Sequence, residues 1–271
     1  MKKHLFILFI ASILTGAFQA QAVGYRGFVD FTAGGASTSL HPYEDHSYAY
    51  YDANLGKYIT KRSFKKSDNH AMMIDWGFTT SHGLQIARNF FVGIGVGVNF
   101  MSYPKNETYL DMGMMVGQYE GGIYNSSYYI WNLRYFVHVR WDGFGLFGIQ
   151  SKLSPFVELK AGYTQNMSNL FVRVFDTKTN WEGNAYNSKG FNDSFFFRPS
   201  IGVRLRLTSK LGLNFGLYCE PFSKLRVKPL NVEDWYGYSD SGEYGHINAQ
   251  VQIPSFDIKY FPFGVNIGLD F

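Results

Sequence analysis

The chain has 271 residues; 19% are Phe, Trp or Tyr, 29 residues are Gly, and only 17% are Asp, Glu, Lys or Arg. The formal net charge of +4 points to no charged partner, and the single cysteine, Cys219, excludes a framework of disulfide bonds. A chain this rich in aromatic residues and glycine is typical of short strands joined by turns.

Residues 1–22 have the features of a secretory signal peptide in the usual order. Two lysines precede an apolar run from Leu5 to about Leu14, and the small-residue sequence "AQA" follows at positions 20–22. The apolar run is shorter than the ~20 residues of a membrane-spanning helix. We therefore expect cleavage after Ala22 and a single mature domain over residues 23–271; an uncleaved membrane anchor is the alternative.

Eight segments of the remaining chain place apolar residues at every second position, which is the pattern of β-strands. This pattern predicts an all-β protein, and eight strands can close into an antiparallel barrel that leaves no unpaired edge. The segment "INAQVQI" (Ile247–Ile253) could pair with a further strand, which would raise the number to ten. The eight segments are Tyr25–Ala33, Met72–Ile86, Phe90–Met101, Tyr129–Trp141, Phe156–Gln165, Phe195–Thr208, Leu211–Cys219 and Phe263–Phe271.

In each segment the two faces differ sharply in charge. The apolar faces carry no Asp, Glu, Lys or Arg. A soluble sheet buries its apolar face, whereas a membrane barrel turns that face to lipid and its polar face to the lumen. In the second case the following residues form a polar network in the lumen: Arg26, Asp30, Asp75, Arg134, His138, Arg140, Glu158, Lys160, Arg198, Arg204, Arg206, Glu220 and Asp270.

The segment "FFVGIGVGVNF" (Phe90–Phe100) favours the membrane orientation. Three glycines on one face would weaken a solvated strand without any benefit. Inside an eight-stranded barrel, however, the lumen is only wide enough for side chains, and long charged side chains need bare wall opposite them. We therefore expect a transmembrane barrel with glycines lining the lumen: Gly93, Gly95, Gly97, Gly202, Gly212, Gly216, Gly264 and Gly268.

The connections alternate between short links and long segments, which is typical of outer-membrane barrels with short periplasmic turns and long extracellular loops. The four long segments are 34–71, 102–128, 166–194 and 220–262. Pro199 cannot donate to a strand ladder, so we expect a bulge near it. Aromatic belts at the two membrane borders would comprise Tyr25, Phe90, Trp141, Phe156 and Phe271 on one side, and Tyr103, Tyr129, Trp131, Tyr163 and Phe195 on the other.

Several motifs resemble a known family. The C-terminal "FGVNIGLDF" resembles the terminal strand signal, ending in Phe271, that the outer-membrane barrel assembly machinery reads. "SHGLQIARNFFVGIGVGVNF", "SPFVELKAGY" and "FFRPSIGVRLRL" resemble segments of small outer-membrane β-barrel domain proteins of Bacteroides-type bacteria. The resemblance implies an eight-stranded barrel in the outer membrane and implies little about activity. "QIARN" departs from the Pro or Asn-Pro expected at the first turn.

A charged lumen allows three interpretations: a structural network, a narrow or gated ion path, or a chemical site. Eight strands leave no open aqueous channel, and buried charges must pair. An enzyme at the extracellular rim would need a histidine base, for which His70 and His82 are candidates, with Asp68 and Ser81 nearby in sequence. The sequence contains no nucleophile elbow or phosphate-binding loop, and no helix follows "GIGVG", so dinucleotide binding is rejected.

The long segments are rich in Tyr, Asn, Gly and Trp, as in "HSYAYYDANLGKY" and "EDWYGYSDSGEYGH", which is the composition of adaptable recognition surfaces. The interpretation that we favour is that they pack on one another as β-hairpins above the bilayer, which "AYYDANLGKYITKRSF" and "LFVRVFDTKTNWEGNAYNS" resemble. "HPYEDH", with His41, Glu44, Asp45 and His46, lacks an established metal-ligand spacing.

We expect a non-enzymatic protein for envelope integrity or surface interaction, without cofactor, metal or nucleic acid. Its partners would be outer-membrane lipid, the assembly machinery, and a glycan or protein outside the cell.

Overall fold

The computed structural model describes residues 24–39, 41–45, 48–61, 64–66, 68–87, 89–102, 109–116, 119–124, 130–143, 152–168, 170–176, 182–187, 190–208, 210–238 and 244–271. The expected signal peptide, residues 1–22, lies outside these ranges. In the described part of the chain, no helix has the length and apolar character needed to cross a membrane.

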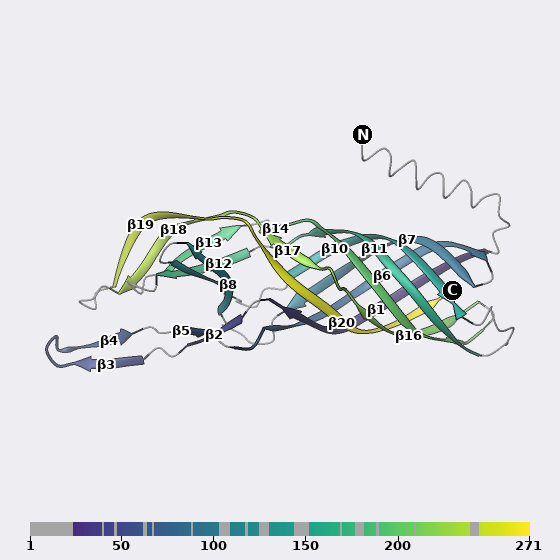
Figure 1. The fold of residues 1–271 in the computed structure, drawn as a ribbon, viewed down its shortest axis with the longest axis horizontal. Helices are drawn as coiled ribbons and strands as arrows, with labels where there is room; N and C mark the ends of the chain where they lie inside the picture. Colours follow the sequence, from purple (N-terminus) through teal and green to yellow (C-terminus); the bar gives the residue numbers. More distant parts are fainter. Residues whose placement is uncertain are drawn as a thin grey trace, which may run out of the picture.

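Eight antiparallel strands form a closed barrel, as predicted (Figure 1). Each strand pairs with its neighbour in chain order, and the last strand pairs with the first through eleven residue partners, from Phe28 and Asp270 to Thr38 and Tyr260. The barrel strands are β1 (Gly24–Thr38), β6 (Met72–Ala87), β7 (Phe90–Ser102), β10 (Ile130–Asp142), β11 (Leu153–Asn166), β15 (Ser194–Arg206), β16 (Gly212–Cys219) and β20 (Phe256–Asp270).

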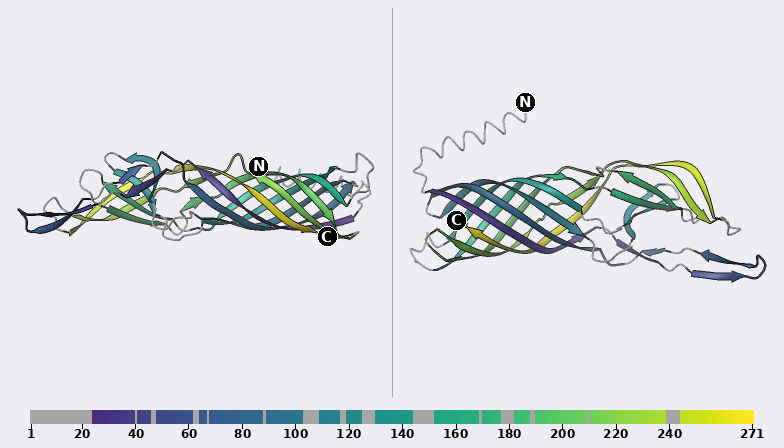
Figure 2. Two further views of the ribbon diagram at one scale, coloured as in Figure 1. Left: turned by 90° about the horizontal axis from the view of Figure 1, so that it is seen from below. Right: turned by 180° about the vertical axis from the view of Figure 1, so that it is seen from behind.

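Connections at one end of the barrel, which we call the short-turn end, include the links from β6 to β7 and from β15 to β16. At the opposite, long-loop end the chain leaves the barrel four times and forms a second β-structure (Figure 2). β1 continues five residues beyond its predicted end, and β20 begins seven residues before its predicted start. The two strands pair with each other beyond the expected membrane border, as far as Thr38 and Tyr260, and residues 256–259 of β20 pair with β17 (Lys224–Val227).

The predicted bulge is not in β15 itself, whereas an extra residue does lie just beyond Cys219, the residue that the β15–β16 register places opposite Pro199. β11 and β15 pair without a register shift, and Leu159 lies opposite Pro199. The pairing of β15 with β16 begins only at Ser200, so Pro199 lies beyond the end of that ladder. A register shift also occurs between Gln85 and Ala87, within the "QIARN" segment that departs from the expected turn.

Burial follows the inside-out pattern of a membrane barrel. Ile94 and Val96 of β7 point outward and are 67% and 49% exposed. On β6 and β10 the inward Asp75 and Arg134 are buried, with 0% and 1% exposure. Since charged side chains are enclosed and apolar side chains cover the outside, the barrel has the surface of a transmembrane protein.

The glycines of β7 lie opposite three large inward side chains of β10. Gly93, Gly95 and Gly97 pair with His138, Phe136 and Arg134, respectively. A Cβ atom added at Gly95 would collide with the Phe136 ring. The bare positions therefore leave room for side chains from the neighbouring strand, as the sequence predicts.

Four of the other five predicted lumen glycines also lie against inward side chains, whereas Gly264 lies against the backbone of Ala33 and Gly34. A Cβ atom would meet the Phe156 ring at Gly202, the Asn266 amide oxygen at Gly216 and the Asp30 carboxylate at Gly268. Gly212 lies beside Asp270. Each of these four glycines thus provides space where the lumen is filled from an adjacent strand.

Replacing the outward Val96 with arginine should lower the free energy of unfolding by about 2–4 kcal/mol, because the charge would face hydrocarbon near the middle of β7. Urea titration in lipid vesicles measures this loss. Val96→Leu, which keeps the side chain apolar, should unfold at a urea concentration close to that of the parent. An equal midpoint for the arginine variant would contradict the outward assignment.

The four long segments pair with one another in a second, eight-stranded sheet, which we call the outer sheet. Each segment contributes two strands, and the segments are joined by the pairs β2–β8, β9–β12 and β13–β18. In sheet order its strands are β5 (Phe64–Lys66), β2 (His41–Asp45), β8 (Tyr109–Val116), β9 (Tyr119–Tyr124), β12 (Leu170–Asp176), β13 (Glu182–Asn187), β18 (Leu230–Tyr238) and β19 (Tyr244–Ile253).

The ten-strand alternative is wrong, because "INAQVQI" belongs to β19 and pairs with β18 in the outer sheet instead of entering the barrel. The two hairpins expected within the first and third long segments are present, as β3–β4 and β12–β13. β3 (Tyr48–Asp52) and β4 (Lys57–Lys61) form a separate two-stranded sheet. β14 (Phe191–Asn192) and β17 (Lys224–Val227) extend the barrel sheet at its long-loop end.

Candidate functional site

The lumen is the candidate site because it encloses almost all the buried charge of the described chain. Among the described residues it holds six cationic and six anionic side chains, so their formal charges cancel when His138 is neutral. The cations are Arg26, Arg134, Arg140, Lys160, Arg198 and Arg204, and the anions are Asp30, Asp75, Asp142, Glu158, Glu220 and Asp270.

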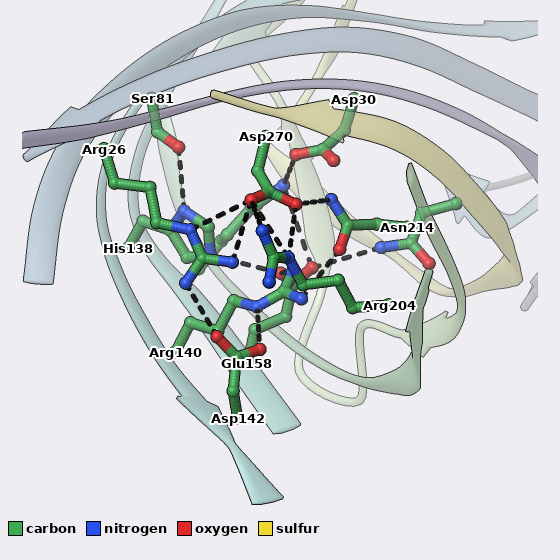
Figure 3. A network of polar contacts seen from close by, with 12 residues as sticks. Arg26, Asp30, Ser81, His138, Arg140, Asp142, Glu158, Arg204, Asn214 and Asp270 are labelled. Carbon is green, nitrogen blue, oxygen red and sulfur yellow. Dashed lines mark hydrogen bonds and ion pairs between the residues drawn. The ribbon is translucent and has the colours of Figure 1, made fainter. Parts of the chain in front are cut away.

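Near the short-turn end, the carboxylate of Asp270 lies at the centre of a cluster from five strands (Figure 3). It accepts hydrogen bonds from Arg26 Nη2 at 3.0 Å, from Arg204 Nη2 at 2.6 Å and from the Asn214 amide at 3.0 Å. Asp142 forms a second junction, accepting from Arg26 Nη1 at 2.7 Å and from Arg140 Nε at 2.9 Å. The cluster ties the first and last strands of the barrel to β10, β15 and β16.

In the middle of the lumen, Lys160 donates to Asp30 across the barrel at 2.6 Å. Beside this pair, His138 lies between two partners: its Nδ1 is 2.7 Å from Ser81 Oγ, and its Nε2 is 3.1 Å from Glu158 Oε2. Glu158 also accepts from the Asn266 amide at 3.1 Å. These contacts link β6, β10, β11 and β20 through one continuous polar chain.

Toward the long-loop end, Glu220 pairs with two arginines. Its Oε1 accepts from Arg134 Nη1 and from Arg198 Nε, each at 2.6 Å, and its Oε2 accepts from Ser223 at 2.9 Å. Glu220 directly follows β16 and keeps its register, since its backbone N–H donates to the Pro262 carbonyl at 2.8 Å. An irregularity follows between Glu220 and β17. The step from Cys219 to Lys224 is five residues, whereas their β20 partners are four residues apart. This extra residue is typical of a bulge.

Aromatic rings separate and cover the guanidinium groups in the lumen. The guanidinium carbon of Arg140 lies 3.7 Å from the centroid of the Phe156 ring, and that of Arg134 lies 4.6 Å from the Phe196 ring. Arg198 lies 4.4 Å from the Tyr218 ring, whose hydroxyl donates to Asp75 at 2.6 Å. Cation–π contacts of this kind strengthen when they are shielded from water.

Twelve of the thirteen residues predicted for the lumen network lie in the lumen, and Arg206 is the exception. Arg206 has inward parity but stands at the end of β15, where its side chain is exposed. Sequence reasoning placed Asp142 in a connecting loop, although continuing the alternation of Arg134, His138 and Arg140 by one step would have identified it. Asn214 and Asn266 were not predicted, because they carry no charge, although both have inward parity.

Of the predicted belt residues, Phe156 lies in the lumen at 2% exposure, so its place in the membrane belt is wrong. Tyr25, Phe271, Tyr163 and Phe195 are exposed on the outer surface. Tyr103 and Tyr129 lie outside the described residues. Phe271 also closes the barrel, since its backbone N–H donates to Gly27 and its carbonyl accepts from Gly27.

Ser81 contacts His138, and His138 contacts Glu158, which is the order of nucleophile, base and acid in a catalytic triad. All three side chains are nearly inaccessible, at 2% exposure or below, so no substrate reaches the serine in the closed barrel. The candidate rim histidines are not brought together. His82 points outward near the short-turn end, with Tyr25 2.5 Å from its ring nitrogen, whereas His70 precedes β6 at the other end.

Within the described residues, no group of three or more His, Cys, Asp or Glu side chains is arranged to hold a metal ion. His46 of the "HPYEDH" segment lies outside the described residues, and the side chains of His41, Glu44 and Asp45 are not described either.

No family model matches the sequence, and no curated protein shows a significant match to it. Among solved structures, the chain is similar to Neisserial surface protein A, with 10% identity over 92% of this chain and 97% of that one, and a TM-score of 0.37. It is similar to the outer membrane protein OprG from Pseudomonas aeruginosa, with 13% identity, 89% and 95% coverage, and a TM-score of 0.37.

A third similar structure is the outer membrane protease OmpT from Escherichia coli, with 8% identity, 93% and 99% coverage, and a TM-score of 0.37. All three are outer-membrane or surface proteins by name. Because the identities and TM-scores are low, the barrel is assigned from strand pairing and burial alone.

Proposed function

We propose that the protein is a non-conducting barrel of the Gram-negative outer membrane that holds a β-structure at the cell surface for interaction with other molecules. In this proposal the short-turn end faces the periplasm and the long-loop end faces the exterior. Residues 1–22 are the signal peptide that directs export, and the barrel belongs to the Bacteroides-type family that its sequence resembles.

The charge-balanced lumen is the observation that carries this proposal. Ion pairs occur near the short-turn end, in the middle and near the long-loop end, at Asp270, Lys160 and Glu220. Phe28, Phe91 and Phe156 fill the space between the polar groups, each with an exposure of 2% or less. An ion crossing the membrane would have to break several buried pairs, each of which is costly to separate.

The outer sheet supports the second half of the proposal. The structure beyond the barrel is built from all four long segments, and hydrogen bonding joins them in one sheet. A barrel whose interior is filled serves well as a rigid anchor, and loops carried on such a scaffold are where binding functions concentrate. Buried Ser81 and His138 act in this proposal as links of the lumen network, and the protein has no enzymatic role.

The protein reconstituted into planar lipid bilayers should give no sustained unit conductance, because the lumen contains paired charges and aromatic rings along its length. As a control, the gel mobility of the same preparation should change on heating, which shows that the reconstituted protein is folded. Regular conductance steps whose number rises with the amount of folded protein would instead support a narrow or gated channel and would contradict the proposal.

A further inference from the structure

The β3–β4 hairpin, Tyr48–Lys61, stands apart from both larger sheets, and we call it the finger. It forms its own two-stranded sheet through five residue pairs, from Tyr48 and Lys61 to Asp52 and Lys57. In Figures 1 and 2 it projects at the far end of the molecule from the short-turn end of the barrel. A lone hairpin has little stability of its own, so a partner that covers it would also stabilise it.

The turn at the end of the finger is well defined. The Asp52 carboxylate accepts backbone N–H bonds from Asn54 at 2.9 Å and from Leu55 at 3.3 Å. Gly56 follows with a φ of 63°, a left-handed conformation that favours glycine. These contacts hold the two strands in register.

Both faces of the finger present tyrosine rings to solvent. Tyr48 and Tyr50 share one face, with ring centroids 6.1 Å apart, and Tyr51 and Tyr58 meet edge-on at 5.3 Å on the other face. The four rings are between 43% and 75% exposed. Large rigid aromatic groups at an exposed tip are characteristic of recognition surfaces.

Residues 48–66, in and directly after the finger, contain five cationic residues and one acidic residue, Asp52, which gives this segment a formal charge of +4. In the register of the hairpin, Lys61 lies opposite Tyr48 and Lys57 lies opposite Asp52. Of the other cationic residues, Arg62 lies outside the described residues, and Lys65 and Lys66 belong to β5, where Lys65 lies opposite Glu44.

We infer that the finger binds an acidic polysaccharide. Aromatic rings offer flat apolar surfaces on which sugar rings can lie, and neighbouring cations attract the carboxylate or sulfate groups of such a polymer. The charge complementarity excludes a neutral glycan as the preferred ligand. The inference rests on the proposed function, because the finger meets external polymers only if the long-loop end faces the exterior. At that surface, polysaccharides are abundant anionic polymers, which favours them over nucleic acid.

The full chain in lipid nanodiscs should bind heparin and alginate, two acidic polysaccharides, and should not bind dextran, which is neutral. Replacing both Tyr48 and Tyr50 with serine should weaken alginate binding by about tenfold or more, since ring contacts of this kind supply part of the affinity. The matched control Tyr25→Ser removes an exposed ring at the opposite end of the molecule, and its binding should equal that of the parent.

A second double variant, Lys57→Gln with Lys61→Gln, should weaken binding and reduce its dependence on salt concentration. Unchanged binding in the tyrosine variant would overturn the inference, because charge alone would then account for attachment. Tighter binding of single-stranded DNA, or of anionic lipid vesicles, would also overturn it in favour of that partner. Absence of polysaccharide binding by a folded, non-conducting parent would refute this inference alone, whereas a conducting parent would refute the proposed function.

Discussion

Replacing Glu220 with glutamine is expected to lower the free energy of unfolding by about 3–5 kcal/mol, because it leaves two buried guanidinium groups without their counter-ion. Arg134 and Arg198 are 1% and 2% exposed, and Glu220 is the carboxylate with which both form ion pairs. Glutamine preserves the shape of the side chain, so the loss measures the unpaired charge and not a cavity. Urea titration of the protein in lipid vesicles gives the value.

Two further variants test this reason. Lys224→Gln removes one partner of an exposed pair with Asp257, whose side chains are 55% and 36% exposed, and should change stability by less than about 1 kcal/mol. A triple variant with Arg134→Met, Arg198→Met and Glu220→Leu should recover most of the lost stability, since well-packed apolar groups can replace a buried ionic cluster. If the triple variant is no more stable than Glu220→Gln, unpaired charge is not the cause.

Replacing Gly95 with phenylalanine should prevent the barrel from closing normally or destabilise it by more than about 3 kcal/mol, because the lumen has no room for a second ring. A Cβ atom alone would already collide with the Phe136 ring, and it would lie 2.6 Å from the Thr80 carbonyl oxygen of the neighbouring strand. Phe136 cannot move away freely, because its ring packs edge-on against Phe196, with ring centroids 6.0 Å apart. Loss of the compact, heat-modifiable band on a gel measures the defect.

Val96→Phe is the matched control, since it places a phenylalanine ring one residue further along the same strand but on the outward face. Because that face meets lipid, the control should fold and run as a compact band. Equal gel mobility and equal urea midpoints for Gly95→Phe and Val96→Phe would show that the two faces of β7 had been assigned incorrectly.

The barrel could be predicted because its environment imposes one simple pattern along every strand. Each residue faces either lipid or the lumen, so alternation alone identified all eight strands and their faces, as the burial of Asp75 and the exposure of Val96 illustrate. The glycines of β7 also indicated which face lines the lumen, because positions without side chains on that face leave space for large side chains of the neighbouring strand. Strand ends were less predictable, since pairing of β1 with β20 continues beyond the apolar pattern.

The detailed site was less accessible to sequence reasoning, because strand parity gives the face of a residue but not its height or its partner. Arg206 and Arg204 have the same parity, yet only Arg204 reaches Asp270, because Arg206 is two residues closer to the end of β15. Phe156 was mistaken for a belt residue although its parity is that of Glu158. Hairpins in the long segments were predicted, but the order in which they pair in the outer sheet was not, because that pairing joins segments far apart in sequence, such as β13 and β18.

The hydrogen-bonded seam between β1 and β20 determines when this protein can complete its fold. Phe28 and Asp270 become partners only when the final stretch has been synthesised and delivered. Until then the remaining strands can form at most an open sheet with two unsatisfied edges, which hydrocarbon does not tolerate. Insertion and closure must therefore coincide late in biogenesis, and a chain interrupted before its last strand would remain exposed to aggregation and degradation.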